Sequence, residues 1–296
     1  MADDAVIVRA PAKINLYLHV TGKRPDVPGV GGFHELDSLV VFTAFGDTVR
    51  VSPAIAGSGI HFTADGRFAD RIGPDADNLV VRAAHLMAGV CQPPNLDVDI
   101  HLTKRLPVAA GIGGGSSDAA ATLRALDRFW KAGLTDDRLA TLGLSLGADV
   151  PMCLRRVPVF IGGIGEDIEA APALPLLSLV LVNPGVAVPT PDVFKAFDGK
   201  FSAPARFAGA PQDTGTLAAL LAERGNDLTN AALTIAPVIG DVLAALDNQP
   251  GCLLARMSGS GATCFGLFAD AGAAGDTRHA IQLTHPDWWC DAMMLF

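Results

Sequence analysis

The sequence predicts a mixed fold of α-helices and β-strands in two domains. From Ile14 to Thr21 apolar and polar residues alternate, which indicates a strand. A glycine-rich segment at 106–121 runs into residues with helical periodicity, so helices are expected as well. A glycine- and proline-rich stretch at 161–175 marks a shift in composition. We therefore expect domains at 1–165 and 166–296, which a chain of 296 residues can accommodate.

Composition limits the classes of partner. Hydrophobic residues make up 50% of the chain and charged residues 18%, which is typical of a compact folded protein. The net charge of −9 argues against a nucleic acid as partner. The five cysteines have no metal-ligand spacing, and no stretch resembles a targeting or membrane segment. The expected protein is cytoplasmic, with reduced cysteines and no membrane contact.

The first strand carries polar side chains on one face. Lys13, Asn15, Tyr17 and His19 lie on that face, and the apolar residues lie on the other. A solvated face is the expectation for Tyr17 and His19. For Lys13, which follows Pro11 at the start of the strand, a place in a site stays open.

The remaining elements follow from periodicity and capping residues. Strand-like runs occupy 39–51 around a Gly46-Asp47 turn, 60–63 and 96–103, and a helix from Asn78 to about Val90 is capped by Asp77. A helix capped by Thr135 runs to about Leu146 and leads to Asp149, which is either a turn former or a site carboxylate. Further on we expect a strand at 176–182, a helix carrying Phe194, helices at 217–224 and 237–246, and a glycine-rich turn at 255–265 followed by a strand through Phe268.

The glycine-rich segment is a candidate phosphate-binding loop. Glycines tolerate positive φ and let consecutive N–H groups turn toward one anion, and the start of the following helix adds its positive end. Ser116 and Ser117 supply hydroxyls for phosphate or magnesium. The segment lacks the Gly-Lys-Ser/Thr of a P-loop. The alternative is a structural glycine turn before a buried helix.

Three separated segments resemble the three motifs of the GHMP small-molecule kinases. They are Pro11-Ala12-Lys13-Ile14-Asn15-Leu16, the loop at 107–121, and Ser258-Gly259-Ser260-Gly261-Ala262. Further similarity to one subfamily lies in Asp77-Asn78-Leu79, Lys104-Arg105-Leu106-Pro107, Leu146-Gly147-Ala148-Asp149-Val150-Pro151 and Pro189-Thr190-Pro191. The resemblance covers nearly the whole chain.

This resemblance implies an α+β fold and an activity. The N-terminal domain would be related to ribosomal-protein S5 and the C-terminal domain would be ferredoxin-like. The subfamily implies transfer of the ATP γ-phosphoryl group to the tertiary 2-hydroxyl of a cytidine-diphosphate-linked methylerythritol, in non-mevalonate isoprenoid synthesis. ATP and Mg²⁺ would be the cofactors, and the protein would be a monomer or weak homodimer.

The resemblance also implies roles for individual residues. Asp149 would take the hydroxyl proton, and Lys13 would hold that hydroxyl and stabilise charge. Asn78 and Lys104 would lie at the adenosine end of ATP. The phosphates would be wrapped by Pro107, Ala109, Ala110, Gly111, Ile112, Gly113, Gly114, Gly115, Ser116 and Ser117, with Ser116 at the metal. Besides Asp149, the other substrate would meet Asn15, Phe33, His34, Thr190 and Phe194.

One segment departs from the family pattern. The family has Asp-Gly-Tyr-His, whereas here residues 27–32 are inserted between Asp26 and Phe33, and phenylalanine replaces tyrosine. Stacking on cytosine survives this change, but a hydrogen bond from the phenol is lost. The alternatives are another kinase of the same family, for homoserine, mevalonate or a sugar, and a nucleotide-binding module without catalysis. His34 with its two phenylalanines argues against the first, and Lys13 with Asp149 against the second.

Overall fold

The computed structural model describes residues 5–25, 32–73 and 77–295. Its contacts divide the chain into two compact units, neither of which is continuous in sequence. The first comprises the residues up to Ala12, Phe45–Val108 and Gly113–Arg156; the second comprises Lys13–Ala44, Ala109–Ile112 and Val157–Phe296. Two long paired strands, β1 (Val6–Lys23) and β2 (His34–Pro53), therefore contribute to both units. The expected boundary between sequence domains at residue 165 stays a prediction.

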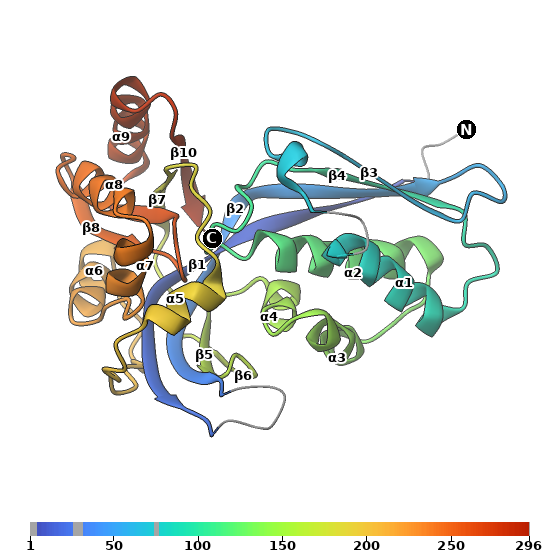
Figure 1. Ribbon diagram of the computed structural model, residues 1–296, viewed down its shortest axis with the longest axis horizontal. Helices are drawn as coiled ribbons and strands as arrows, with labels where there is room; N and C mark the ends of the chain where they lie inside the picture. Colours follow the sequence, from blue (N-terminus) through green and yellow to red (C-terminus); the bar gives the residue numbers. More distant parts are fainter. Residues whose placement is uncertain (1–4, 26–31, 74–76, 296) are drawn as a thin grey trace. The chain divides into compact units, whose positions relative to one another are not determined.

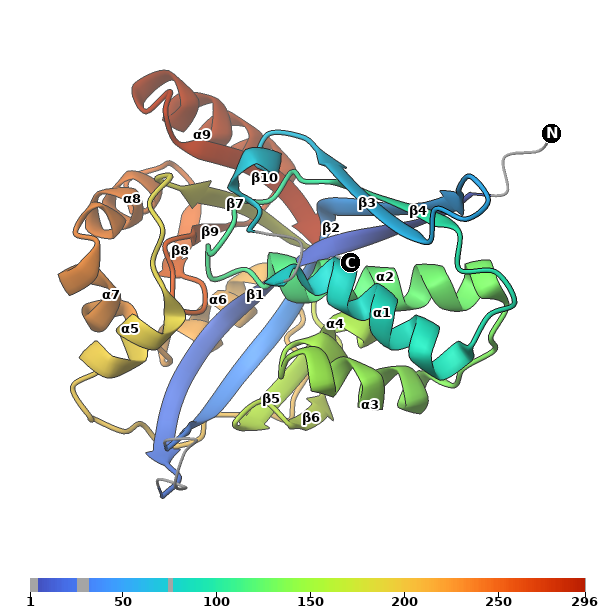
Figure 2. The same cartoon turned by 45° about the vertical axis from the view of Figure 1, so that its right-hand side comes forward.

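The first unit joins a sheet to a layer of helices. In it β4 (Val98–Thr103) pairs in parallel with β3 (Ile60–Asp65) and antiparallel with the end of β2, where Thr48 lies opposite Thr103. Alternate residues of β4 are buried, as its sequence pattern predicts. Figures 1 and 2 both show α1 and α2 side by side. The helices of this unit are α1 (Leu79–Cys91), α2 (Gly114–Trp130), α3 (Asp136–Leu146), α4 (Val150–Arg155) and the short 3₁₀ helix η1 (Ala69–Arg71).

Side-chain caps fix where two of these helices begin. The Thr135 hydroxyl accepts a hydrogen bond from the Arg138 N–H, which confirms the predicted start of α3. The predicted cap of α1 is wrong by one residue. Asn78, not Asp77, caps this helix, because Asn78 Oδ1 accepts from Val80 N at 2.8 Å. Aspartate and asparagine are both favoured at this position, so residue type does not distinguish them. The extended backbone of Asn78, directly before the first helical residue, makes it the cap.

The predicted turn at Gly46-Asp47 is also wrong, because β2 runs through it without a break. A side chain at Gly46 would place its Cβ 2.6 Å from Pro11 Cα and against the Ala10 carbonyl oxygen. The glycine is thus required for close approach of two strands. Asp47 is completely buried, and its carboxylate accepts backbone hydrogen bonds from Arg105 and Leu106. Glycine and aspartate here serve packing rather than chain reversal.

The second unit contains an antiparallel sheet of four strands. Its order is β10 (Trp289–Leu295), β7 (Leu177–Asn183), β9 (Cys264–Phe268) and β8 (Cys252–Met257). Helices connect β7 to β8 and β9 to β10, which makes the β-α-β-β-α-β order of a ferredoxin-like domain, as predicted. Figure 1 shows α8 and α9 alongside this sheet. The helices are α5 (Thr190–Ala196), α6 (Thr214–Ala222), α7 (Thr229–Ile235), α8 (Val238–Asp247) and α9 (Ala271–Thr284).

The first part of β2 forms a second region of sheet in this unit. There Leu36–Val40 pairs antiparallel with β5 (Val159–Gly163), which in turn pairs antiparallel with β6 (Asp167–Ala170). Pattern analysis did not identify η1, α4, α7, β5, β6 or β8, nor any element beyond Phe268, and the expected turn at 255–265 is wrong at its start, where 255–257 belong to β8. These elements are short or lie in alanine-rich sequence with weak periodicity.

The expected solvated face of β1 is wrong. Tyr17 is fully buried and His19 is 8% exposed, because both faces of the strand are covered. The Tyr17 hydroxyl donates to Asp37 Oδ2 at 2.9 Å, and His19 Nδ1 lies 2.9 Å from the Ala203 carbonyl oxygen. Burial, reinforced by Asp37, raises the pKa of Tyr17, so its hydroxyl keeps the proton that it donates.

Two findings bear on the cellular setting. The five cysteines, all among the described residues, form no disulfide bond. Within the same described ranges no helix combines the length and the apolar character that crossing a bilayer requires.

Candidate active site

Lys13 is held in place by backbone and side-chain contacts within the second unit. Its backbone N–H donates to the Ile112 carbonyl oxygen at 2.9 Å, which ties the start of this part of β1 to the glycine loop. Its side chain is 8% exposed, and Nζ donates to Asn15 Oδ1 at 3.0 Å. Because a lysine that is nearly buried keeps its position, Lys13 presents an ordered ammonium group.

The orientation of the Asn15 amide follows from its neighbours. Ser38 Oγ lies 2.5 Å from the Tyr17 carbonyl oxygen and must donate its one proton there. Ser38 therefore accepts from Asn15 Nδ2, at 2.8 Å, and the other end of the amide, Oδ1, faces Lys13. These hydrogen bonds fix the Asn15 amide with its oxygen toward the Lys13 ammonium group.

The second glycine turn packs directly on the first. Asn15 N donates to Ser258 Oγ at 3.1 Å, and Ser258 Oγ donates to the Gly111 carbonyl oxygen at 3.2 Å. A Cβ at Gly111 would lie 2.7 Å from Gly261 N and against the Ser258 carbonyl oxygen, so only glycine fits. Thr263 N donates to the Ala110 carbonyl oxygen at 3.2 Å. The structure thus brings together parts of all three separated motifs within this one unit.

The loop backbone has the geometry of an anion-binding site. Positive φ recurs at every second residue, with 52° at Ala109, 72° at Gly111 and 62° at Gly113. Alternation of this kind turns successive N–H groups toward one side and forms a concave nest. The helix α2 begins at Gly114, and its first-turn amides have no acceptors within the helix. The nest and the helix start together favour bound phosphate.

The two loop serines differ in their surroundings. Ser117 is 1% exposed, and its hydroxyl donates to the Pro11 carbonyl oxygen at 2.5 Å, so this group has a structural partner. Ser116 is half-buried in the first turn of α2. Of the two, Ser116 is therefore the better candidate for a metal or phosphate ligand.

Asp149 stands at the start of α4 in the first unit. It occupies the N-cap position with helical φ and ψ, but its side chain makes no capping hydrogen bond. Pro151 follows in the first turn, where the missing N–H is tolerated, and Asp149 is half-buried. An acidic side chain at this position that does not cap its helix is suited to a role outside the helix.

The two residues expected at the adenosine end are in the first unit. Lys104 is 3% exposed, and its ammonium group contacts Asp47 Oδ2 and, at 2.8 Å, Asp118 Oδ2. The Asn78 side chain caps α1. A contact of either residue with adenosine, for instance through the backbone, stays a prediction.

The aromatic residues expected to bind cytosine lie in the second unit. The His34 ring stacks on Phe194, with centroids 5.0 Å apart and planes at 23°, and it meets the edge of Phe197 at 5.8 Å. Phe33 is 47% exposed. Burial, with a smaller effect of Lys23, lowers the pKa of His34, which favours a neutral ring that can both donate and accept. Of the insertion at 27–32, residues 27–31 lie outside the described residues.

Thr190, at the start of α5, also meets one of the three motifs. Its Oγ1 lies 2.8 Å from Ser260 Oγ in the second glycine turn. The structure further adds Ser38 to the network around Lys13 in the second unit, and Asp47 and Asp118 to the surroundings of Lys104 in the first unit. Pattern analysis missed their roles, since a serine or aspartate has the same local signature in a turn as in a buried network.

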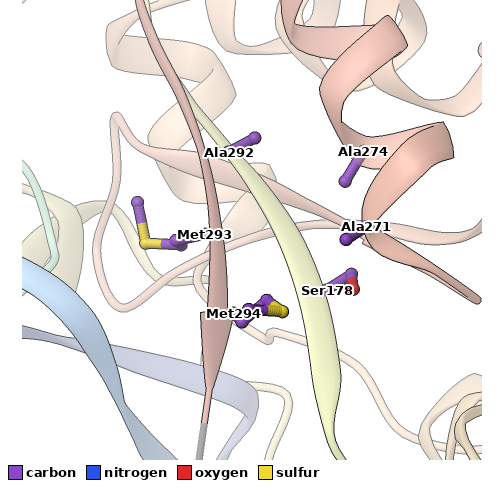
Figure 3. Close-up of a pocket in the computed structure, with 6 residues that line it drawn as sticks. All are labelled: Ser178, Ala271, Ala274, Ala292, Met293 and Met294. Atoms are coloured by element: carbon purple, nitrogen blue, oxygen red, sulfur yellow. The ribbon is translucent and has the colours of Figure 1, made fainter.

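A separate small cavity does not have the chemistry of this site. It has a volume of about 190 Å³ and lies between α9 and the strands β7 and β10 (Figure 3). Its lining residues are Ser178, Ala271, Ala274, Ala292, Met293 and Met294. Since none of them is charged and Ser178 is the one polar side chain among them, the cavity lacks the acid, the base and the cation that phosphoryl transfer needs.

Comparison with known proteins agrees with the fold. Residues 78–156 match the model of the GHMP kinases N terminal domain, and residues 205–287 match that of the GHMP kinases C terminal domain. The chain belongs to the GHMP kinase family and is a phosphotransferase. Within the family it groups with the 4-diphosphocytidyl-2-C-methyl-D-erythritol kinases.

Two relatives that carry this name match the chain over nearly its full length. The relative from Paramagnetospirillum magneticum is 50% identical over 285 residues, 95% of each chain. The one from Rhodospirillum rubrum is 49% identical over 293 residues, 98% of this chain and 93% of its own.

Solved structures confirm the two-domain α+β architecture. A crystal structure of a 4-(cytidine 5'-diphospho)-2C-methyl-D-erythritol kinase superimposes with a TM-score of 0.79 and 33% identity, over 98% of this chain and 99% of that one. Homoserine kinase from Cytophaga hutchinsonii superimposes with a TM-score of 0.72 but 18% identity, over 100% of this chain and 96% of that one. The second likeness shows the fold alone.

Proposed function

We propose that this chain transfers the γ-phosphoryl group of ATP to the 2-hydroxyl of 4-diphosphocytidyl-2-C-methyl-D-erythritol. The observation that carries the proposal is the assembly around Lys13, where the lysine, part of the phosphate loop and the second glycine turn meet in one network of hydrogen bonds. Half of the residues are identical to a kinase named for this substrate, over nearly the full length. The cytoplasmic location and the monomeric or weakly dimeric state stay predictions.

The residues divide the chemistry among them. Asp149 accepts the proton of the attacking hydroxyl, whose oxygen forms a bond to the γ-phosphorus while the bond from that phosphorus to the β,γ-bridging oxygen breaks and ADP leaves. The Lys13 ammonium stabilises the charge on the transferred group. Phosphoryl transfer depends chiefly on positioning and charge neutralisation, so no covalent intermediate is required.

The first turn of α2 fits a magnesium ion bound with ATP. Mg²⁺ is usually held by substrate phosphates, waters and only one or two protein oxygens. The half-buried Ser116 hydroxyl can supply such a ligand. Among the described residues no cluster of three His, Cys, Asp or Glu side chains could hold a metal, which agrees with a site built mainly from the nucleotide. The ion would neutralise charge on the phosphates.

A coupled assay for ADP release tests the substrate assignment. The cytidylylated methylerythritol is compared with mevalonate, homoserine and galactose, each with ATP and Mg²⁺. We expect turnover with the first substrate only. Turnover with one of the others would identify a different kinase of the family, and ATP binding without turnover on any of them would identify a nucleotide-binding module.

Truncation of the aromatic cluster tests cytosine recognition. Phe194→Ala or Phe33→Ala should raise the KM for the cytidylylated substrate by about ten- to a hundredfold, since stacking one base is worth roughly 1–3 kcal/mol. The KM for ATP should barely change. Phe33→Tyr restores the phenol that the family has and should have a small effect. An increase in the KM for ATP alone would reverse the assignment of the two ends of the site.

A branched side chain in the phosphate loop tests the nest. Gly113→Val places a β-branched residue at a φ of 62°, where the backbone must approach phosphate, so ATP affinity should fall sharply. Gly133→Val is the matched control, because Gly133 has a φ of 66° with open space around its missing Cβ. Calorimetry gives the Kd of ATP, and circular dichroism checks the fold. Normal ATP binding by Gly113→Val would make the loop a structural turn, and equal losses in both variants would indicate a general effect of valine at positive φ.

A further inference from the structure

Three charged side chains in the first unit form a buried cluster that the proposed mechanism does not use. Asp47 is fully buried, and Lys104 and Asp118 are each 3% exposed. The Lys104 ammonium binds one oxygen of each carboxylate, Asp47 Oδ2 and Asp118 Oδ2. Asp47 lies in β2, Lys104 directly follows β4, and Asp118 lies in the first two turns of α2. We call these three residues the Asp47 cluster.

The cluster is attached to both ends of the phosphate loop. On the side where the chain enters, Asp47 Oδ1 accepts from the N–H of Arg105 at 2.5 Å and from that of Leu106 at 2.8 Å. On the side where the chain leaves, Asp118 lies in α2, which begins at Gly114. Hydrogen bonds through Asp47 and the Lys104 ammonium group thus link Leu106, before the loop, to Asp118, after it.

The start of α2 lies directly over the ammonium group. A Cβ at Gly114 would sit 3.1 Å from Lys104 Nζ and 3.9 Å from Asp47 Oδ2. A side chain here would push the Lys104 ammonium group aside by a few tenths of an ångström, so the close approach favours glycine at this first residue of the helix. Any shift of Lys104 therefore reaches the first turn of the helix, where phosphate is expected to bind.

The cluster contains two acidic groups and one basic group. Two carboxylates face one ammonium group, and Asp118 Oδ1 is buried without a hydrogen-bond partner. Burial raises the pKa of Asp118, against the opposing effect of Lys104. Buried ion pairs contribute little net stability, whereas loss of one partner leaves an uncompensated charge. Such a cluster is better suited to fixing a geometry than to stabilising the fold.

We propose that Asp47, Lys104 and Asp118 are positioning residues that hold the two ends of the phosphate loop at the spacing that binds ATP. The proposal rests on ATP binding at this loop, which is part of the proposed function. It assigns the Lys104 side chain to the loop rather than to adenosine. Its effect should be on ATP affinity, and the second substrate should be bound as before.

The test compares two replacements of Asp118. Asp118→Ala removes one of the two carboxyl groups that accept from Lys104. Lys104 and Asp47 remain as an ion pair without net charge, so the fold should survive while the loop loses its attachment through α2. Asp118→Asn keeps an oxygen for the ammonium group. We expect the Kd of ATP to rise about tenfold in the alanine variant, about 1.4 kcal/mol, and to stay within about twofold in the asparagine variant.

Thr122→Ala is the matched control on the same helix. Thr122 is fully buried, and its hydroxyl donates to the Asp118 carbonyl oxygen without reaching Lys104. Its Kd for ATP should equal that of the unmodified protein. Thermal unfolding of all three variants measures any general loss of stability.

Two results would overturn the proposal: an unchanged Kd of ATP in Asp118→Ala, or equal weakening in Asp118→Ala and Thr122→Ala. The Kd is measured by calorimetry with ATP alone, so the outcome does not depend on which hydroxyl is phosphorylated. Where turnover is found, KM for ATP should rise with little change in kcat or in KM for the second substrate. Failure of the substrate assignment and failure of this inference are therefore distinguishable.

Discussion

We expect Asp149→Asn to lower kcat by about a hundredfold or more, which is the scale of losing a general base. The Kd of ATP should stay nearly unchanged. The reason lies in the position of Asp149 at the start of α4, where its side chain does not cap the helix. An amide of the same shape therefore leaves the start of α4 without a lost cap and removes the group that we propose accepts the proton.

Single-turnover measurements with saturating ATP and cytidylylated substrate separate this loss from slow product release. Asp137→Asn is the control, since Asp137 lies in the first turn of the neighbouring helix α3 and is exposed. Its kcat should match that of the unmodified protein. Near-normal turnover in Asp149→Asn would remove Asp149 from the mechanism.

Lys13→Met should also reduce kcat by about a hundredfold or more, because a charge that stabilises the transferred phosphoryl group is lost. Methionine is similar in length and fills the same buried path along β1, where the lysine is 8% exposed. The backbone bond to Ile112 is retained, so the loop keeps this attachment. The loss should therefore appear in the chemical step.

The exposed Lys200 offers a matched control for loss of a positive charge. Its side chain is 88% exposed and pairs with Asp198 at the surface, so Lys200→Met should leave kcat and both KM values as they are. If Lys13→Met raised a KM and spared kcat, the lysine would contribute uniform binding instead of stabilising the transition state.

Local features of the sequence determined several parts of the fold. The alternating residues of 96–103 and the Thr135 cap correctly predicted β4 and the start of α3. The glycines of the loop, followed by helical periodicity, predicted the loop and α2. These signals are reliable because each depends only on residues close in sequence or on the ability of glycine to adopt positive φ.

The family was also evident from the sequence, since three short motifs in order define it. What the motifs could not reveal was how residues outside them support the site. Ser38 has no distinctive neighbours, yet its one proton determines which end of the Asn15 amide faces Lys13. That role depends on contact with the Tyr17 carbonyl oxygen, 21 residues away in the chain.

Tertiary structure alone decided the meaning of the charged residues around the loop. Gly46-Asp47 has the local signature of a turn, but close packing on Ala10 and Pro11 keeps it inside a strand. Asp47 reaches Lys104 across 57 residues, and Lys104 reaches Asp118 across 14. Periodicity and turn preferences describe a residue's neighbours along the chain, whereas the environment of a buried charge is formed by residues distant in sequence. The sequence by itself therefore determined the family, the loop and the principal helices and strands, and only the packed structure decided which side chains hold that loop in place.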